Sequence, residues 1–349
     1  MDQSANPRTA AYRIGDDGTP RVVDAAGHPE VARLRAWLGE RDVWVQDALR
    51  RDGALLFRGF DVGDAATFES VATAIAPVLR DDLPGMPGRP LTEFVHPSSE
   101  VAPHFPLSQH LERGHVATPP ARIFFGCLEA PPRGSGETPL ADFRKVFADL
   151  SPNTRDRFEA RGVRTVRNLR GPSTGRRPWS QERWDCVFRT SDRQAIEARC
   201  ARDAIQTEWR TDDGLRLTFD RPASRAHPET GERVWHNQVA PDHIGAATLD
   251  NRRIFGLRPG LRSLLLWQSM RLRLALIRRT PPDLVPSFCT YGDGQEIPET
   301  DLREVWDAIW RHLAIWDWRR GDVLVLDNHA MSHGRFPYRG RRRVVTCLA

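Results

Sequence analysis

Four short apolar segments constrain the fold of this 349-residue chain most. Each has the length and composition of a buried strand, and none is long enough for a typical helix. They are ALLFRGF at 54–60, ARIFFGCLEA at 121–130, DVLVLD at 322–327 and RRVVTCL at 342–348. Their wide spacing fits neither a regular alternation of strands and helices nor a coiled coil. The pattern indicates a mainly β protein with flanking helices, an α+β arrangement.

Helical patterns lie between these strands. Apolar residues recur at helical spacing from Pro29 to Arg51 and from Leu302 to Leu313. Asp64, Ser151 and Thr300 have side chains suited to cap the first turn of a helix. We therefore expect helices after each of these three residues.

The domain organisation follows from the same patterns. Residues 1–28 are polar and rich in Gly, Pro and Asp, which predicts an irregular lead-in. Residues 29–349 are expected to form a single domain with a helical insert around 245–285. Within this insert, leucines alternate with arginines over residues 261–279. A basic amphipathic helix at a membrane surface and a helix packed on a sheet both fit, and we favour the second.

Composition narrows the function. The chain has 51 Lys and Arg against 46 Asp and Glu, and the basic residues are scattered, which argues against nucleic-acid binding and is compatible with an anionic substrate. No apolar run is long enough to cross a membrane. The first residues lack the apolar segment of a signal peptide, so a cytoplasmic location is expected. The five widely spaced cysteines form no CxxC pair, which argues against a disulfide framework and against a zinc site.

The segment QHLERGH contains His110 and Glu112, two residues apart. On a strand, such residues point to the same face, so one imidazole and one carboxylate can approach the same metal ion. A triplet of this kind is frequent by chance and fits exposed polar residues equally well. It needs a third ligand before it indicates a metal site.

The C-terminal stretch GDVLVLDNHAMSHGRFPYRGRRRVV supplies candidates for that ligand. An apolar strand leads into a polar loop with His329 and His333, and an arginine-rich strand follows. A non-haem iron oxygenase requires two histidines and one carboxylate on one face of the metal. If 2-oxoglutarate also binds the metal, its far carboxylate needs a cation, and the planar guanidinium of arginine suits it.

Taken in order, six segments of the chain resemble the taurine dioxygenase (TauD/TfdA) family of Fe(II)- and 2-oxoglutarate-dependent oxygenases. The resemblance is strongest to the branch of clavaminate synthase and the SyrP-type amino-acid hydroxylases. Besides ALLFRGF and HLE, the segments are PPARIFFGCLEAPPRGSGETPLADFRKV, HPETGERVWHNQ, TYGDGQEI and WRRGDVLVLDNHAMSHGR with the following YRGRRR. The resemblance implies a double-stranded β-helix, or jelly roll, with Fe(II) as cofactor and 2-oxoglutarate and O₂ as cosubstrates.

The resemblance also assigns the iron ligands. His110, Glu112 and His333 match the three ligand positions, whereas His329 does not align and is expected in a loop. Related halogenases lack the metal carboxylate, so the presence of Glu112 implies that this chain is not a halogenase.

For 2-oxoglutarate, Thr138 in GETPLAD and Arg342 match the family's binding residues. Arg335, in the HGR triplet, is expected to belong to the same cofactor-binding group.

Three further residues are expected to face the substrate: His236, Asn237 and Thr346. Several relatives carry a second arginine where this chain has Thr346, which implies that the substrate is not held by an acidic group at that point. His236 stands where relatives have an aromatic residue, and a hydrogen-bonded histidine in the core is an equal alternative.

The resemblance implies hydroxylation of an unactivated C–H bond in a small molecule, an amino acid or amino-acid-derived intermediate of specialised metabolism. The substrate is either free or tethered to a carrier protein, and the oligomeric state stays open. Desaturation, epoxidation or cyclisation by the same cofactors is the first alternative. The alternative of another class is a non-catalytic jelly roll that acts as a binding or scaffold protein. We expect neither a nucleic-acid nor a membrane partner.

Overall fold

The computed structural model describes residues 12–14, 18–80, 88–175, 181–237 and 239–349. Its centre is a seven-stranded sheet, antiparallel except where β2 pairs with β3. In spatial order, its strands are β1 (Arg13–Ile14), β2 (Arg21–Asp24), β3 (Ala54–Arg58), β15 (Val323–Asp327), β6 (Arg122–Glu129), β17 (Arg343–Leu348) and β4 (His96–Pro97). The four apolar segments are thus confirmed as the strands β3, β15, β6 and β17, which lie side by side.

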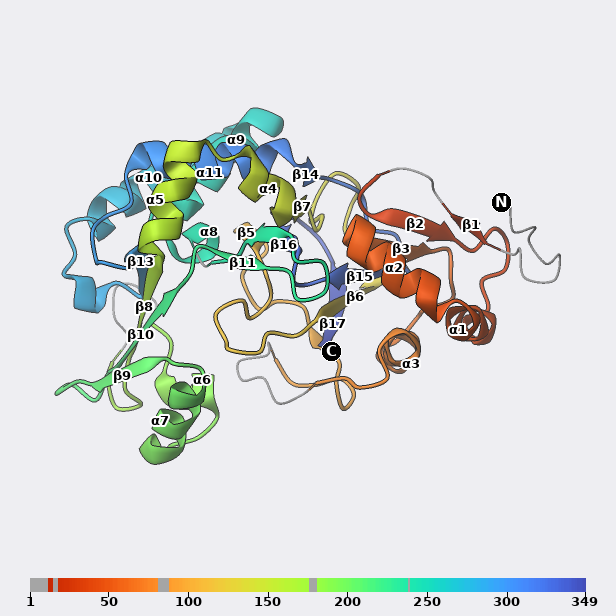
Figure 1. Cartoon of the computed structure of the whole chain (residues 1–349), viewed down its shortest axis with the longest axis horizontal. Helices are drawn as coiled ribbons and strands as arrows, with labels where there is room; N and C mark the ends of the chain where they lie inside the picture. Colours follow the sequence, from red (N-terminus) through yellow and green to blue (C-terminus); the bar gives the residue numbers. More distant parts are fainter. Residues whose placement is uncertain (1–11, 15–17, 81–87, 176–180, 238) are drawn as a thin grey trace.

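A four-stranded antiparallel sheet faces this large sheet, and the two form the predicted jelly roll (Figure 1). Its strands, in spatial order, are β14 (Leu313–Ala314), β7 (Leu140–Asp142), β16 (Met331–Arg335) and β5 (Leu107–His110). Phe125 and Leu324 from the large sheet share one buried cluster with Leu140 and Met331 from the small one. The space between the sheets is therefore a packed core.

The outer face of the large sheet is covered by the helices α1 (Val31–Glu40) and α3 (Ala65–Ile75). Side chains alternate along β6: Phe125 points to the inner cluster, and Phe124 packs with Leu38 and Phe68 beneath the helices. Burial on both faces explains why these strands are apolar without interruption.

The structure corrects the expected lead-in at residues 1–28. Within the described part of that range, β1 and β2 add to the large sheet, and β2 is hydrogen bonded to β3. The helix expected from Pro29 to Arg51 is two helices, α1 and α2 (Asp42–Asp52), which meet at Arg41. Because Arg41 has φ −122° and ψ 24°, the helical path is interrupted there.

Two of the three expected helix caps are confirmed. Asp64 accepts a hydrogen bond from Thr67 N at 2.8 Å, and Ser151 accepts one from Thr154 N at 3.4 Å. Thr300 is not a cap, because α11 (Glu299–Arg311) begins before it and Pro298 occupies the capping position.

A third sheet and several helices flank the small sheet of the jelly roll (Figure 1). This third sheet also has four strands, in the order β13 (Ser287–Tyr291), β8 (Val163–Leu169), β10 (Leu215–Arg221) and β9 (Gln206–Trp209). The remaining elements of this region are α4 (Phe143–Asp149), α5 (Pro152–Arg161), α6 (Trp184–Phe188), α7 (Arg193–Arg202), β11 (Ser224–Ala226), β12 (Arg233–Trp235) and α8 (Val239–Asp242). Strand β8 and helix α8 are important for the site, because they contribute Arg167 and Asp242, respectively, to the cavity described below.

The helical insert consists of α9 (Ala246–Leu257), α10 (Leu261–Ile277) and a short 3₁₀ turn at Pro282–Leu284. The main neighbour of α10 is α9, so the expected packing of this helix on a sheet is wrong. Met270 and Ile277 are its buried residues. Among the described helices, none combines the length and the hydropathy that crossing a membrane requires. All five cysteines lie in the described part and are free thiols.

Candidate metal centre and cavity

Strands β5 and β16 bring two histidines together. The backbone register pairs His110 directly with His333, and their ring centroids are 4.3 Å apart. His333 therefore lies on a strand and not in the loop that the sequence suggested. His329 occupies the turn between β15 and β16, as expected. Glu112 follows the end of β5, so the strand predicted to carry both His110 and Glu112 ends at His110.

Three potential metal ligands converge here. The Oε2 atom of Glu112 lies 3.8 Å from Nε2 of His110 and 3.7 Å from Nε2 of His333. One ligand atom from each residue lies within 4.8 Å of the others, and within the described residues this is the one group of this kind. Two imidazoles and one carboxylate on one side of a point form the facial arrangement of a non-haem iron centre.

The surroundings of the two histidines suit a divalent metal. His110 Nδ1 lies 2.8 Å from the carbonyl oxygen of Ser108, which orients the ring and leaves Nε2 for the metal. Burial and the neighbouring His110 lower the pKa of His333 well below its ordinary value, so His333 is a neutral imidazole. Neutral imidazole and ionised carboxylate are the forms that bind metals.

Asn328 holds the segment that carries Glu112. Its Oδ1 accepts a hydrogen bond from the backbone N–H of Glu112 at 2.7 Å, and its Nδ2 donates to Glu112 O at 2.8 Å. The same Nδ2 also lies 2.9 Å from Pro120 O. Asn328 therefore fixes the backbone beyond β5 where strand pairing has ended. Sequence reasoning missed this residue, because its partner is more than two hundred positions away.

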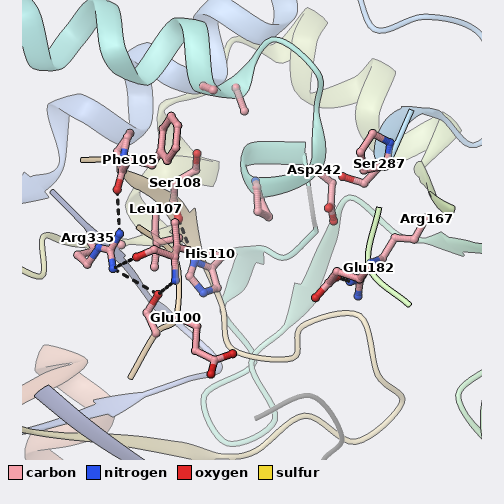
Figure 2. Close-up of a pocket in the computed structure, with 18 of the residues that line it drawn as sticks. Glu100, Phe105, Leu107, Ser108, His110, Arg167, Glu182, Asp242, Ser287 and Arg335 are labelled. Carbon is pink, nitrogen blue, oxygen red and sulfur yellow. Dashed lines mark hydrogen bonds and ion pairs between the residues drawn. The ribbon is translucent and has the colours of Figure 1, made fainter. Parts of the chain in front are cut away.

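A cavity of about 1330 Å³ opens over the three residues. This is larger than the usual pocket for a small ligand, roughly 300–1,000 Å³. Figure 2 shows Arg335 and Phe105 on one side of His110, and Asp242, Ser287, Arg167 and Glu182 on the other.

Thr138 and Arg342 meet at the cavity wall. The Nη2 atom of Arg342 donates to Thr138 Oγ1 at 3.2 Å, and Arg342 Nε donates to the carbonyl oxygen of Gly136 at 2.9 Å. Trp318 Nε1 also donates to Thr138 Oγ1, at 3.0 Å. Burial and the nearby Arg335 lower the pKa of Arg342 to about 10, so it remains a cation at neutral pH. Within the described residues no carboxylate is hydrogen bonded to it, which makes this a place for an incoming anion.

Arg335 is engaged differently from Arg342. Its guanidinium donates to the carbonyl oxygens of Val101, Ala102 and Phe105, each at 2.9 Å. A fourth contact, of 3.3 Å, reaches Ser99 Oγ. Arg335 thus connects residues 99–105 to β16, and the N–H groups of its guanidinium that make these bonds are directed at the protein backbone and Ser99, not at the cavity.

The three residues expected at the substrate have different locations. Thr346 lines the cavity, but its hydroxyl donates to Phe124 O at 2.8 Å. Neither His236 nor Asn237 is among the described residues that line the cavity. His236 is buried, which lowers its pKa to about 4, and Asn237 bonds to the backbone of Ala223 and Val239. His236 and Asn237 are therefore buried residues outside the described lining of the cavity.

The chain belongs to the taurine catabolism dioxygenase TauD, TfdA family, whose sequence profile matches residues 20–348. It is accordingly a 2-oxoglutarate-dependent non-haem iron oxygenase. The ligand triad, the cavity and the jelly roll are consistent with that membership.

Two curated relatives and one solved structure show the extent of the similarity. The dapdiamide synthesis protein DdaC of Enterobacter agglomerans is 28% identical over 308 residues, which cover 87% of this chain and 84% of DdaC. A clavaminate synthase-like protein of Arabidopsis thaliana is 28% identical over 313 residues, with the same coverage of 87% and 84%. The crystal structure of PvcB from Pseudomonas aeruginosa aligns over 100% of this chain and 94% of its own, with a TM-score of 0.52 and 12% identity. This last similarity supports the fold.

Proposed function

We propose that this enzyme hydroxylates an unactivated C–H bond of an amino acid or an amino-acid-derived small molecule. The observation that carries the proposal is the convergence of His110, Glu112 and His333 at a large cavity. When Fe(II), 2-oxoglutarate and O₂ are bound, they supply the oxidising chemistry, in which 2-oxoglutarate is converted to succinate and CO₂. The protein binds the reactants, orients the substrate and excludes water.

In this proposal, His110, Glu112 and His333 would hold the iron. The cavity that opens over these residues would admit 2-oxoglutarate and O₂ to it. The hydrogen bond at His110 Nδ1 and the bonds between Asn328 and the Glu112 backbone keep two ligands oriented. Such outer contacts are a general requirement of metal sites.

Arg342 and Thr138 bind the far carboxylate of 2-oxoglutarate. Arg342 is a buried cation, and its planar guanidinium matches a carboxylate with two parallel hydrogen bonds. The bonds to Gly136 O and Thr138 Oγ1 hold its position. Arg335 acts beside this site by anchoring residues 99–105, as its contacts indicate.

The proposed substrate class is supported by similarity and by size. DdaC, similar over most of its length, is named for dapdiamide synthesis, which favours a role in specialised metabolism. A cavity of about 1330 Å³ accommodates an amino-acid derivative, either free or at the end of a carrier-bound arm. The size of the cavity is equally compatible with desaturation or cyclisation of such a substrate, and analysis of the product distinguishes these reactions from hydroxylation.

The test is turnover against a panel of L-α-amino acids and their N-acyl and amide derivatives. We expect succinate release that depends on one member, together with a product that has gained one oxygen atom. The His333→Ala variant should release no succinate, and His312→Ala, which replaces a histidine outside the cavity, should behave as the parent. A product that has lost two hydrogen atoms and gained no oxygen would show that the enzyme catalyses desaturation or cyclisation and not hydroxylation. Absence of succinate with every compound would contradict the proposed amino-acid substrate class.

A further inference from the structure

The cavity is lined by many arginines, and Figure 2 shows one of them, Arg167, on the other side of His110 from Arg335. Besides Arg335 and Arg342, the described arginines that line the cavity are Arg113, Arg167, Arg170, Arg183, Arg189 and Arg273. Arg170 donates to backbone carbonyls, and Arg183 pairs with Asp185. Arg113 and Arg167 are the most informative of the set, because Arg113 contacts the metal ligand Glu112 and Arg167 interacts electrostatically with Arg113.

Arg113 directly follows the metal ligand Glu112 and has a left-handed backbone with φ of 53°. This conformation is unfavourable for a long side chain and is typical of functional positions. Its side chain is 14% exposed, and Nε lies 3.3 Å from Glu112 Oε1. By geometry, this buried Nε has no hydrogen-bond partner among the described residues. Arg113 thus lies between the carboxylate of Glu112 and the other arginines that line this cavity.

Arg167, on β8, completes the positive site. Its Nη2 donates to Glu182 Oε2 at 2.8 Å, and Glu182 is mostly exposed. Such an exposed ion pair contributes little, about 0–1 kcal/mol, so a substrate anion can take the place of Glu182. Arg167 interacts electrostatically with Arg113 on one side and with Asp242 on the other.

Asp242, at the end of α8, offers the opposite charge. Its carboxyl lines the cavity and is hydrogen bonded to Ser287, which faces it in Figure 2. Burial raises the pKa of Asp242, and Arg167, Ser287 and His110 act in the other direction. A cation that enters beside Asp242 would therefore stabilise its ionised form.

We propose that Arg113 and Arg167 bind the carboxylate of an α-amino acid headgroup, and that Asp242 binds its ammonium group. This inference rests on the proposed amino-acid substrate and assigns its binding site. An α-amino acid carries both charges on one carbon, so two points of attachment fix its orientation. Because Arg113 adjoins Glu112 and Asp242 lies within electrostatic range of His110, the headgroup is held beside the metal. On β17, Thr346 carries no charge and its hydroxyl donates a hydrogen bond to Phe124 O, so this residue cannot pair with the carboxylate of the headgroup.

The experiment is calorimetric binding to the anaerobic Fe(II)–2-oxoglutarate protein. The probes are L-α-amino acids, each compared with its C-terminal amide and with its deaminated acid. We expect the parent to bind at least one amino acid about tenfold or more tightly than either analogue, which is the loss of one charge-assisted contact. Arg113→Gln and Arg167→Gln should remove the preference over the amide. Asp242→Asn should remove the preference over the deaminated acid, whereas Arg183→Gln, at a cavity residue already paired with Asp185, should keep both.

The visible charge-transfer band of each sample separates this inference from the proposed function. A normal band with amides bound as tightly as amino acids, or with no amino acid bound, would overturn the headgroup site and leave the iron site intact. Absence of the band in the parent would instead contradict the proposed function. If only the Arg113→Gln variant loses the band, the substitution has disturbed the metal ligand Glu112. In that case the binding preference of Arg167→Gln tests the headgroup site.

Discussion

His110, the last residue of β5, and His333, the middle residue of β16, are direct cross-strand partners with ring centroids 4.3 Å apart. The metal centre thus depends on the register of one strand pair. A slip by one residue would turn either histidine to the opposite face of the sheet. Next to the histidines, Ser332 Oγ lies 2.8 Å from Gln109 Oε1 and 2.9 Å from Ala141 O. This buried contact links β5, β7 and β16.

The first prediction concerns this contact. Ser332→Ala should lower the affinity for Fe(II) roughly tenfold or more, as loss of outer contacts does at other metal sites. It should also reduce the free energy of unfolding by about 1–3 kcal/mol, because the buried Gln109 oxygen loses its partner. Metal titration and urea unfolding measure the two effects. Unchanged iron affinity in a destabilised protein would show that Ser332 supports the fold alone.

The second prediction concerns Arg342. Arg342→Ala should raise the 2-oxoglutarate concentration for half-saturation about 100-fold, which corresponds to roughly 3 kcal/mol for a buried charge pair. The adjacent Arg341 side chain is 86% exposed, so Arg341→Ala is the matched control and should change nothing. Titration of 2-oxoglutarate into the Fe(II) protein gives both values. Equal values for the two variants would remove Arg342 from the cosubstrate site.

Arg335 should behave as an anchor of residues 99–105. Arg335→Met leaves three backbone carbonyls without their donors, and we expect the free energy of unfolding to fall by about 2–4 kcal/mol. The affinity for 2-oxoglutarate should fall far less than in Arg342→Ala. The reverse result, with stability retained and 2-oxoglutarate binding lost, would show that Arg335 binds the cosubstrate directly.

The fourth prediction concerns the acid stability that Asp327 provides. Burial would raise the pKa of this fully buried carboxyl, but the hydrogen bond from His227 and the charge of Arg122 outweigh it and hold the pKa below its ordinary value. A carboxyl with a depressed folded pKa stabilises the protein above its unfolded pKa, about 3.9, and loses that effect as the pH falls through the folded pKa.

Asp327→Asn should therefore be about 3 kcal/mol less stable than the parent at pH values near 6, because a buried charge pair is broken. The difference should shrink steadily once the pH falls below about 4. Urea unfolding across this range measures it. A difference that stays constant with pH would mean that the charge of Asp327 is irrelevant to stability.

The strands of the large sheet were predictable because their burial on both faces makes them continuously apolar, as in Phe124 and Phe125. Strand β16 was not predictable in this way, because its sequence MSHGR is mostly polar although every residue in it is buried. Its strand conformation comes from pairing with β5 and β7, which no local pattern records.

The same distinction applies to the site. His110, Glu112 and His333 were predicted because they match the ligand positions of the family's motifs, whereas the spacing of His110 and Glu112 alone would also fit exposed polar residues. The wall formed by Arg113, Arg167 and Asp242 was not, because three distant segments contribute to it and arginine is common throughout the chain. For His236 and Asn237 the resemblance left two environments open, because membership of a family segment does not determine which way a side chain faces; both are buried outside the described lining of the cavity.

The most direct test of this account is an anaerobic titration of the metal-free protein with Fe(II) and 2-oxoglutarate, followed by visible absorption. The account predicts a metal-to-ligand charge-transfer band in the parent and in His312→Ala, and no band in His110→Ala or His333→Ala. A folded parent protein that retains iron but shows no band would contradict it, as would a band that persists unchanged without His110.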